Sequence, residues 1–212
     1  MLPAPGPSSS IGNPDGIDWP FASVGLAMQP GEMRHALIVV DVQKGFDDPV
    51  WGPRNNPACE SNIAALIQHW RVKDRAVVFV RHDSAAPTGR LKPATPGNQF
   101  KDFVQGKPDL LVVKSVNSAF HGEPDLHAWL QAADLKGLVI CGITTNHCCE
   151  TTARIAGNLG YDVQFVLDAT HTFDRRGPDG TVITADDLAR VTAANLQDEF
   201  ATVTTTAAML RW

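Results

Sequence analysis

A cysteine at the start of a predicted helix has the clearest potential for chemistry in this chain. Cys148 follows the apolar run 138–142, which predicts a buried strand, and precedes a helix that we expect to extend to about residue 159. Helix N-termini carry unpaired N–H groups and the positive end of the helix dipole, so they favour negative charge. We therefore expect the Cys148 thiol to have a lowered pKa and to act as a nucleophile. The nearby backbone N–H groups could hold an oxyanion.

Two charged residues occupy equivalent places at the ends of other predicted strands. Asp41 ends the apolar run 36–40, and Lys114 ends the apolar run 110–113. In an open parallel sheet, ligands bind outside the carboxyl ends of the strands. Each residue also has an ordinary explanation, as a turn former, a solvated lysine or a buried cysteine. An acid, a base and a thiol that converge on one crevice nevertheless indicate a catalytic site.

Three segments in this order resemble the isochorismatase-like cysteine hydrolases, a superfamily that includes nicotinamidases, carbamoyl-amide hydrolases and related amidases. The segments are Asp-Val-Gln-Lys-Gly-Phe at 41–46, the strand end at Lys114, and the run 142–154. Any one of them alone would be a weak signal, whereas the three together are highly specific. The resemblance covers roughly residues 35–206.

The resemblance implies a catalytic triad of Asp41, Lys114 and Cys148. Asp41 would be the general base, and Lys114 would stabilise the thiolate and position Asp41. It also implies that Thr144 and Cys148 supply the N–H groups of an oxyanion hole, and that the peptide bond between Ile143 and Thr144 is cis.

The remaining cysteines are expected to be structural. Cys149 stands where this family commonly has a small aliphatic residue, usually Val, but the register of the family motif selects Cys148 as the nucleophile. One step along a helix rotates a side chain by about 100°, which directs Cys149 to the core. Cys59 and Cys141 are also interpreted as core residues.

The sequence lacks the metal-binding pattern of nicotinamidases, which place Asp-x-His and a further His after the second strand. Here Asp83 is followed by Ser-Ala, and no histidine occurs again until His121. We therefore expect no metal and no other cofactor. His82 is interpreted as a loop histidine, with a substrate contact as the alternative.

Aromatic residues after the first and third predicted strands are candidates for a substrate pocket. They are Phe46, Trp51 and Phe120. Ordinary packing explains Trp51 and Phe120 more readily, whereas Phe46 lies within the first motif of the family. Residues 83–109 contain many Pro and Gly residues and predict a long loop, and loops of this length are often functional.

Composition places the chain among globular proteins. The 212 residues are 43% hydrophobic and 19% charged, which suits one α/β domain with a substantial core. The net charge of -5 gives no nucleic-acid footprint. No apolar run approaches the roughly 20 residues that span a membrane, and the start does not resemble a signal peptide. Four cysteines do not suggest a disulfide framework, so we expect a cytoplasmic protein.

Alternating strands and helices predict a three-layer α/β/α sandwich with a mostly parallel, Rossmann-like six-stranded sheet. The expected strands are 36–40, 76–80, 110–113, 138–142, 163–167 and 201–204. The expected helices start at Asn56-Pro57, at 123, beside Cys148 and at 184 or 185. Residues 35–212 would form the hydrolase domain. Residues 1–34, rich in Pro, Gly and Ser, would form an arm that is either loose or packed on this or a second subunit.

We expect a metal-independent cysteine hydrolase that cleaves a C–N bond of a small amide or ureido compound through a thioester. Isochorismate cleavage, which is vinyl ether hydrolysis, is one alternative, and a non-catalytic protein that binds a small molecule is another. The expected partners are a small-molecule substrate and further copies of the chain, in a dimer or tetramer.

Overall fold

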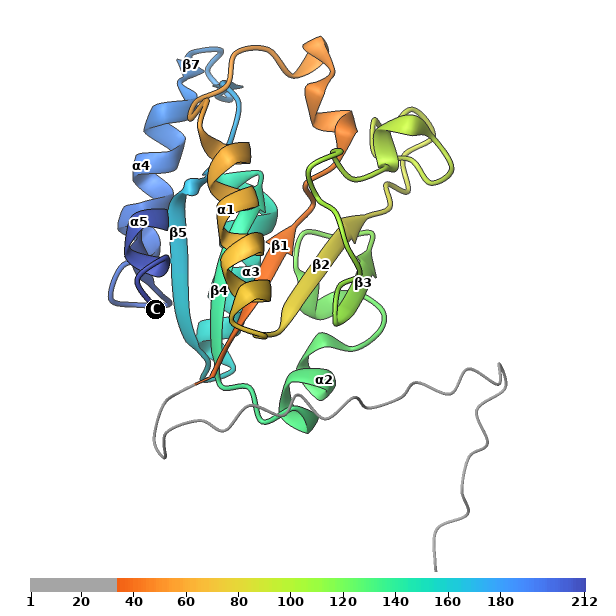
Figure 1. The fold of residues 1–212 in the computed structure, drawn as a ribbon. Coiled ribbons are helices and arrows are strands. Elements are labelled where there is room, and N and C mark those ends of the chain that lie inside the picture. Colours follow the sequence, from red (N-terminus) through yellow and green to blue (C-terminus); the bar gives the residue numbers. More distant parts are fainter. Residues whose placement is uncertain (1–33) are drawn as a thin grey trace, which may run out of the picture.

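A single parallel sheet organises the computed structural model, which describes residues 34–212 (Figure 1). The predicted N-terminal arm therefore lies outside the described residues, apart from residue 34. The strand order is β3-β2-β1-β4-β5-β8, and each neighbouring pair is parallel. The strands are β1 (His35–Val40), β2 (Val77–His82), β3 (Leu110–Lys114), β4 (Gly137–Ile143), β5 (Asp162–His171) and β8 (Thr202–Thr204).

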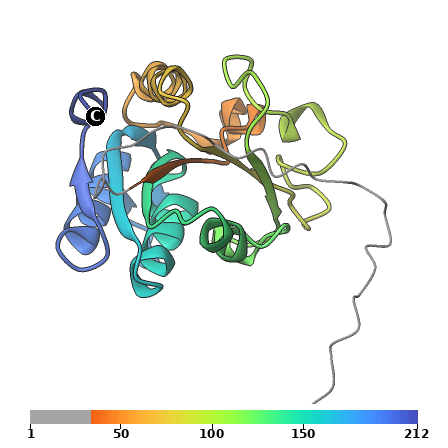
Figure 2. The same ribbon diagram turned by 60° about the horizontal axis from the view of Figure 1, so that its bottom comes forward.

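Helices cover both faces of this sheet, which confirms the predicted three-layer α/β/α fold (Figure 2). One face packs against α1 (Cys59–Val72) and α5 (Thr206–Met209). The other face packs against α2 (Leu126–Ala132), α3 (Glu150–Asn158) and α4 (Ala185–Leu196). All residues of β1 and of β4 are buried, as expected for central strands covered on both sides.

The strand order places a topological switch point between β1 and β4. From β1 the chain passes outward to β2 and β3, and it then returns to form β4 on the opposite side of β1. Connections that leave two neighbouring strands in opposite directions open a crevice at their carboxyl ends. The residues that follow β1 and β4 therefore border the crevice where open α/β sheets bind ligands.

Short helical turns and a small hairpin complete the described chain. They were not predicted, because segments of two to five residues carry little periodic signal. The hairpin joins β6 (Arg175–Arg176) to β7 (Val182–Ile183). The turns are η1 (Lys44–Asp47), η2 (Pro49–Trp51), η3 (Pro96–Asn98), η4 (Ala119–His121) and a π-helical turn, η5 (Thr145–Cys149).

Two helix caps predicted from the sequence have different outcomes. Thr184 caps α4 as expected, because its hydroxyl oxygen accepts the N–H of Asp187 at 3.1 Å. Asn56 does not cap α1, which begins at Cys59. The Asn56 amide instead donates to the carbonyls of Asp168 and Thr170 in β5, at 2.8 and 2.6 Å.

Other boundaries differ from expectation in length. β5 does not end at residue 167 but continues to His171, past an irregularity in its pairing with β4. α2 begins at Leu126, where the Asp125 carboxylate accepts the N–H of Ala128, and not at residue 123. Among residues 34–212, no helix has both the length and the apolar character of a membrane span.

The contact between β1 and β4 gives a stability prediction. Gly142 has φ of +133°, and a Cβ built there would lie 2.0 Å from the Val40 carbonyl oxygen. Gly160 also has positive φ, +84°, but a Cβ there meets nothing within 4 Å. We expect Gly142→Ala to lower the free energy of unfolding by about 3 kcal/mol or more, from strain and overpacking, and Gly160→Ala by about 1 kcal/mol. Urea denaturation measures both, and equal losses would contradict the prediction.

Candidate active site

The ammonium group of Lys114 lies at the centre of a buried polar cluster. Its Nζ is 2.6 Å from Oδ2 of Asp41, 3.1 Å from Nδ1 of His82 and 3.5 Å from Sγ of Cys148. The side chains of Lys114 and Asp41 are 0% exposed. An ammonium has three N–H donors, so each proton has one acceptor in this cluster.

The side chains of this cluster lie at the carboxyl ends of strands. Lys114 and His82 are the last residues of β3 and β2 and pair in register, while Asp41 directly follows β1. Asp41 has φ of +51°, a left-handed conformation that Asp adopts more readily than most residues. Its N–H donates to the Val80 carbonyl at 2.9 Å. The structure thus brings together the acid, base and thiol that were expected to converge.

Cys148 lies in the π-helical turn η5, which continues directly into α3 at Glu150. The predicted helix after Cys148 is therefore present and ends at Asn158, but its first turn is π-helical. The Cys148 thiol also contacts Oδ1 of Asn117 at 3.8 Å. The peptide bond between Ile143 and Thr144, just before η5, is cis, as the family resemblance implied. Thr144 itself is buried.

The other cysteines are core residues. Cys149, Cys141 and Cys59 are all 0% exposed, which confirms their interpretation as structural. Burial raises the pKa of the Cys149 thiol well above its usual range, so Cys149 is a poor nucleophile.

The expected lowering of the Cys148 pKa is wrong for the free site. Burial raises the pKa of this thiol, the Asp41 carboxylate raises it further, and Lys114 lowers it only in part. Burial also raises the pKa of Asp41, although Lys114 opposes this effect. The resting cysteine is therefore a neutral thiol beside a carboxylate whose raised pKa makes it a better proton acceptor.

His82 is a member of the cluster, and its interpretation as a loop histidine is wrong. It ends β2, and its backbone is fixed by the side chain of Gln43, which accepts its N–H at 2.8 Å and donates to its carbonyl at 3.0 Å. β2 extends two residues beyond the predicted strand 76–80, and this extension brings His82 to the same sheet edge as Lys114. Asn117 carried no strand-end signal, because it lies in the turn after β3.

The predicted pocket aromatics separate into two groups. Phe46 and Trp51 pack against Phe173, with ring centroids 6.3 and 5.6 Å away, and Trp51 donates its indole N–H to the Gly45 carbonyl. Phe120 packs against Tyr161, on the other face of the sheet. The structure therefore does not bring Phe120 together with the other two.

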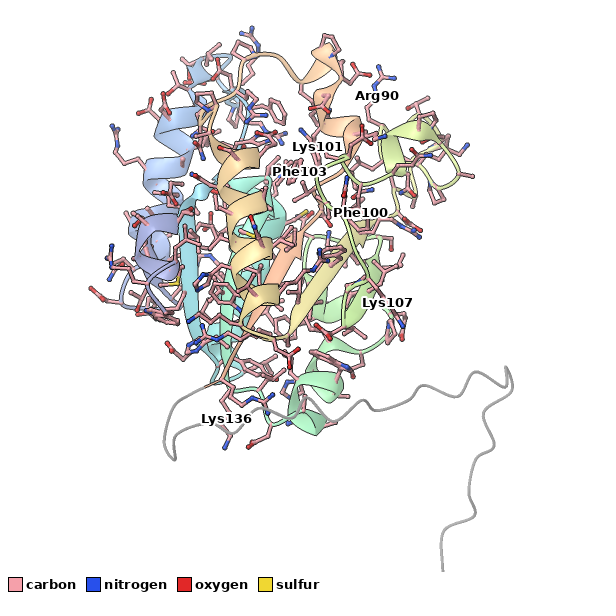
Figure 3. The ribbon with its side chains drawn as sticks, in the orientation of Figure 1. Arg90, Phe100, Lys101, Phe103, Lys107 and Lys136 are labelled. Carbon is pink, nitrogen blue, oxygen red and sulfur yellow. The ribbon has the colours of Figure 1, made fainter. Side chains whose placement is uncertain are left out.

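The predicted long loop 83–109 contains one short helical turn, η3, which packs against η1. Lys101 (Figure 3) is 7% exposed, and its ammonium contacts Asp47 in η1 at 2.5 Å and Glu60 in α1 at 2.8 Å. The Gly45 and Gly97 backbones approach so closely that a Cβ on Gly97 would lie 3.2 Å from the Gly45 Cα. The loop is therefore anchored to the segment that follows Asp41 and to the carbonyl of His82.

One trio in residues 34–212 combines the residue types and spacing that a metal ion requires. The possible ligand atoms of Asp41, His82 and Cys148 all lie within 4.8 Å of one another. The cation that contacts all three is the Lys114 ammonium. Burial lowers the pKa of Lys114, but Asp41 and Cys148 raise this pKa by more than burial lowers it. The net pKa is raised, so Lys114 stays charged. A metal ion would have to displace this ammonium, so the trio fits lysine better than a metal.

Comparison with known proteins identifies the family. The model of the isochorismatase domain matches residues 35–208, which is most of the chain. The chain belongs to the isochorismatase family of hydrolases. A crystal structure of an isochorismatase-family protein from Chromobacterium violaceum superposes with a TM-score of 0.80 and 35% identity, over 87% of this chain and 95% of that one.

Two sequence relatives extend this family assignment. The uncharacterized isochorismatase family protein YrdC of Bacillus subtilis is 40% identical over 176 residues, 82% of this chain and 94% of its own. Nicotinamidase 3 of Arabidopsis thaliana is 30% identical over 168 residues, 73% of this chain and 81% of its own.

The charge on Lys114 gives a prediction about the thiol of this isochorismatase-family protein. Because Lys114 lowers the pKa of Cys148, Lys114→Met should raise it and slow iodoacetamide alkylation of Cys148 at fixed neutral pH by about tenfold or more. Lys136→Met is the control, since Lys136 is exposed and far from the site (Figure 3). The alkylated peptide is quantified by mass spectrometry, and circular dichroism verifies the fold. An unchanged rate would remove Lys114 from the site.

Proposed function

We propose that this isochorismatase-family hydrolase cleaves a C–N bond of a small amide or ureido compound through a thioester on Cys148. The observation that carries the proposal is the Cys148 thiol, held 3.5 Å from a buried ammonium and within 4.8 Å of the Asp41 carboxylate. A thiol between a proton acceptor and a fixed cation is arranged for nucleophilic attack. The relationship to a nicotinamidase, named for an amide substrate, supports the same class.

In the first half-reaction, Asp41 takes the proton of the Cys148 thiol as Sγ attacks the substrate carbonyl carbon. Lys114 stabilises the thiolate character of the sulfur during this transfer. The tetrahedral intermediate then collapses, Asp41 returns the proton to the nitrogen, and ammonia or an amine leaves. The raised pKa of Asp41 suits both transfers, because general catalysis is most efficient when the pKa lies close to the working pH.

In the second half-reaction, water hydrolyses the thioester. Asp41 accepts a proton from the attacking water, the new tetrahedral intermediate collapses, and the C–S bond breaks. The proton returns from Asp41 to the Cys148 sulfur, and a carboxylic or carbamic acid is released. The same carboxylate thus acts in both halves, so the site needs no second titrating base.

The oxyanion of both intermediates would be bound by the backbone N–H groups of Thr144 and Cys148. Thr144 directly precedes η5 and Cys148 lies within it, so both donors belong to one short segment. Loss of one such donor typically costs about 10²–10³ in rate. Phe46 and Trp51 contact each other and would border a compact apolar part of the pocket, next to the loop 83–109.

Isochorismate cleavage is the less favourable alternative. Hydrolysis of a vinyl ether begins with proton transfer to an alkene carbon, and a thiol has no evident part in that step. Isochorismate therefore leaves the contacts of Cys148 with Lys114 and Asn117 without a chemical purpose.

The two adjacent cysteines offer a matched pair of variants. Cys148→Ala should reduce turnover to background without unfolding the protein, because it removes the nucleophile. Cys149→Ala should keep most of the activity and lose some stability, because Cys149 is a fully buried core residue. Steady-state kinetics and thermal denaturation measure both effects. An inactive Cys149→Ala with an active Cys148→Ala would reverse the assignment.

Metal removal is a second test. Because the Lys114 ammonium contacts all three members of the trio Asp41, His82 and Cys148, we expect activity to survive exhaustive chelation. Elemental analysis should find no stoichiometric zinc, iron or manganese. Activity that disappears on chelation and returns with one added metal would overturn this part of the proposal.

The reaction class is tested by a screen for ammonia release over small amides and ureido compounds. With a confirmed substrate, rapid quenching and mass spectrometry should show an acyl adduct on the Cys148 peptide. The same assay on Cys148→Ala should show no adduct. If isochorismate proves to be the best substrate and no adduct accumulates, the vinyl ether alternative replaces the amide hydrolase.

A further inference from the structure

His82 is anchored more firmly than a substrate contact requires. Gln43 accepts its N–H and donates to its carbonyl, and the Asn98 amide donates to the same carbonyl at 3.0 Å. The next residue, Asp83, donates its N–H to the Lys114 carbonyl at 2.7 Å. The backbone on which the imidazole stands is therefore fixed on several sides.

The contact with Lys114 defines the protonation state of His82. An ammonium can only donate, so Nδ1 of His82 must accept the proton from Nζ at 3.1 Å, and the imidazole proton lies on Nε2. Burial and Lys114 lower the pKa of His82, while the nearby Asp41 and Asp83 carboxylates raise it less. The Cys148 sulfur also lies within 4.8 Å of a ring nitrogen of His82. His82 is thus neutral at neutral pH.

His82 is the third acceptor of the Lys114 ammonium, and this neutral acceptor determines where the ammonium points. Asp41 is an anion at 2.6 Å and attracts Nζ strongly, whereas the resting Cys148 thiol is a weak acceptor at 3.5 Å. Without His82, one buried N–H of Lys114 would lose its partner, and such unmet donors are costly. The flexible lysine side chain would then move toward Asp41 and away from the sulfur.

We infer that His82 is a positioning residue: its Nδ1 holds the Lys114 ammonium between Asp41 and Cys148, and in this way it maintains the stabilisation of the Cys148 thiolate. The inference rests on the proposed function of Cys148 as the nucleophile. In this role His82 does not contact the substrate, and His82 affects Cys148 entirely through Lys114.

Two substitutions separate positioning from other roles. The Asn side chain can place an acceptor where Nδ1 lies, whereas Gln places it farther out, where Nε2 lies. We therefore expect His82→Ala and His82→Gln to raise the apparent pKa for alkylation of Cys148 and to slow alkylation at neutral pH by about tenfold. His82→Asn should restore most of the wild-type profile. The exposed His121, changed to Gln, is the matched control and should leave the profile unchanged.

The measurement is the pH dependence of iodoacetamide alkylation of the full chain, read from the Cys148 peptide by mass spectrometry and compared with the buried Cys141. Circular dichroism verifies that each variant is folded. A wild-type profile in His82→Ala, or equal behaviour of His82→Asn and His82→Gln, overturns the role of His82 and leaves the proposed function of Cys148 standing. If Cys148 in the wild-type protein reacts no faster than Cys141, the proposed function and this inference both fail.

Discussion

A buried cation imposes the main constraint on this structure. The Lys114 ammonium lies where neither it nor Asp41 reaches water, and the free energy of removing two charges from water often exceeds their mutual attraction. Such a pair is a poor device for stability, and apolar residues would fill the space at lower cost. The proposed reaction would account for its presence, because the ammonium would neutralise the negative charge that develops on the adjacent sulfur.

The position of the cluster follows from the topology of the sheet. Asp41 and Lys114 are 73 residues apart in sequence, and Lys114 and Cys148 are 34 apart. No local segment can form the cluster; it exists only when β1, β2, β3 and β4 are in register. The close approach of Gly142 to Val40 helps to set that register. The carboxyl ends of parallel strands lie at one edge of the sheet, so formation of the sheet brings all members of the charged cluster together.

The sequence predicts the framework well because it depends on patterns along the chain. Apolar runs ending in Asp41 and Lys114, and a motif around Cys148, were sufficient to locate a shared crevice. The raised pKa of Cys148 could not be predicted, since it depends on burial by segments distant in sequence. Phe120 was expected beside Phe46 and Trp51, but η4 packs it against Tyr161 in the other core cluster. That cluster also contains Cys148, so a substrate contact of Phe120 stays a prediction. His82 was missed because β2 extends past its apolar run, which ends at residue 80, to a polar strand end that carries no hydrophobic signal.

The anchoring of the loop 83–109 also has a consequence for protein engineering. Among its contacts with the domain are those of Asn98 and Lys101 and the close approach of Gly97 to Gly45. Residues 85–88, by contrast, are exposed at the other end of the loop. If substrate recognition falls to this loop, as its length predicts, it would be carried by a part of the chain separate from Asp41, Lys114 and Cys148. A library with new lengths and sequences at 85–88 would leave these anchors and the charged cluster intact, and it would show how far this exposed segment determines which compounds are hydrolysed.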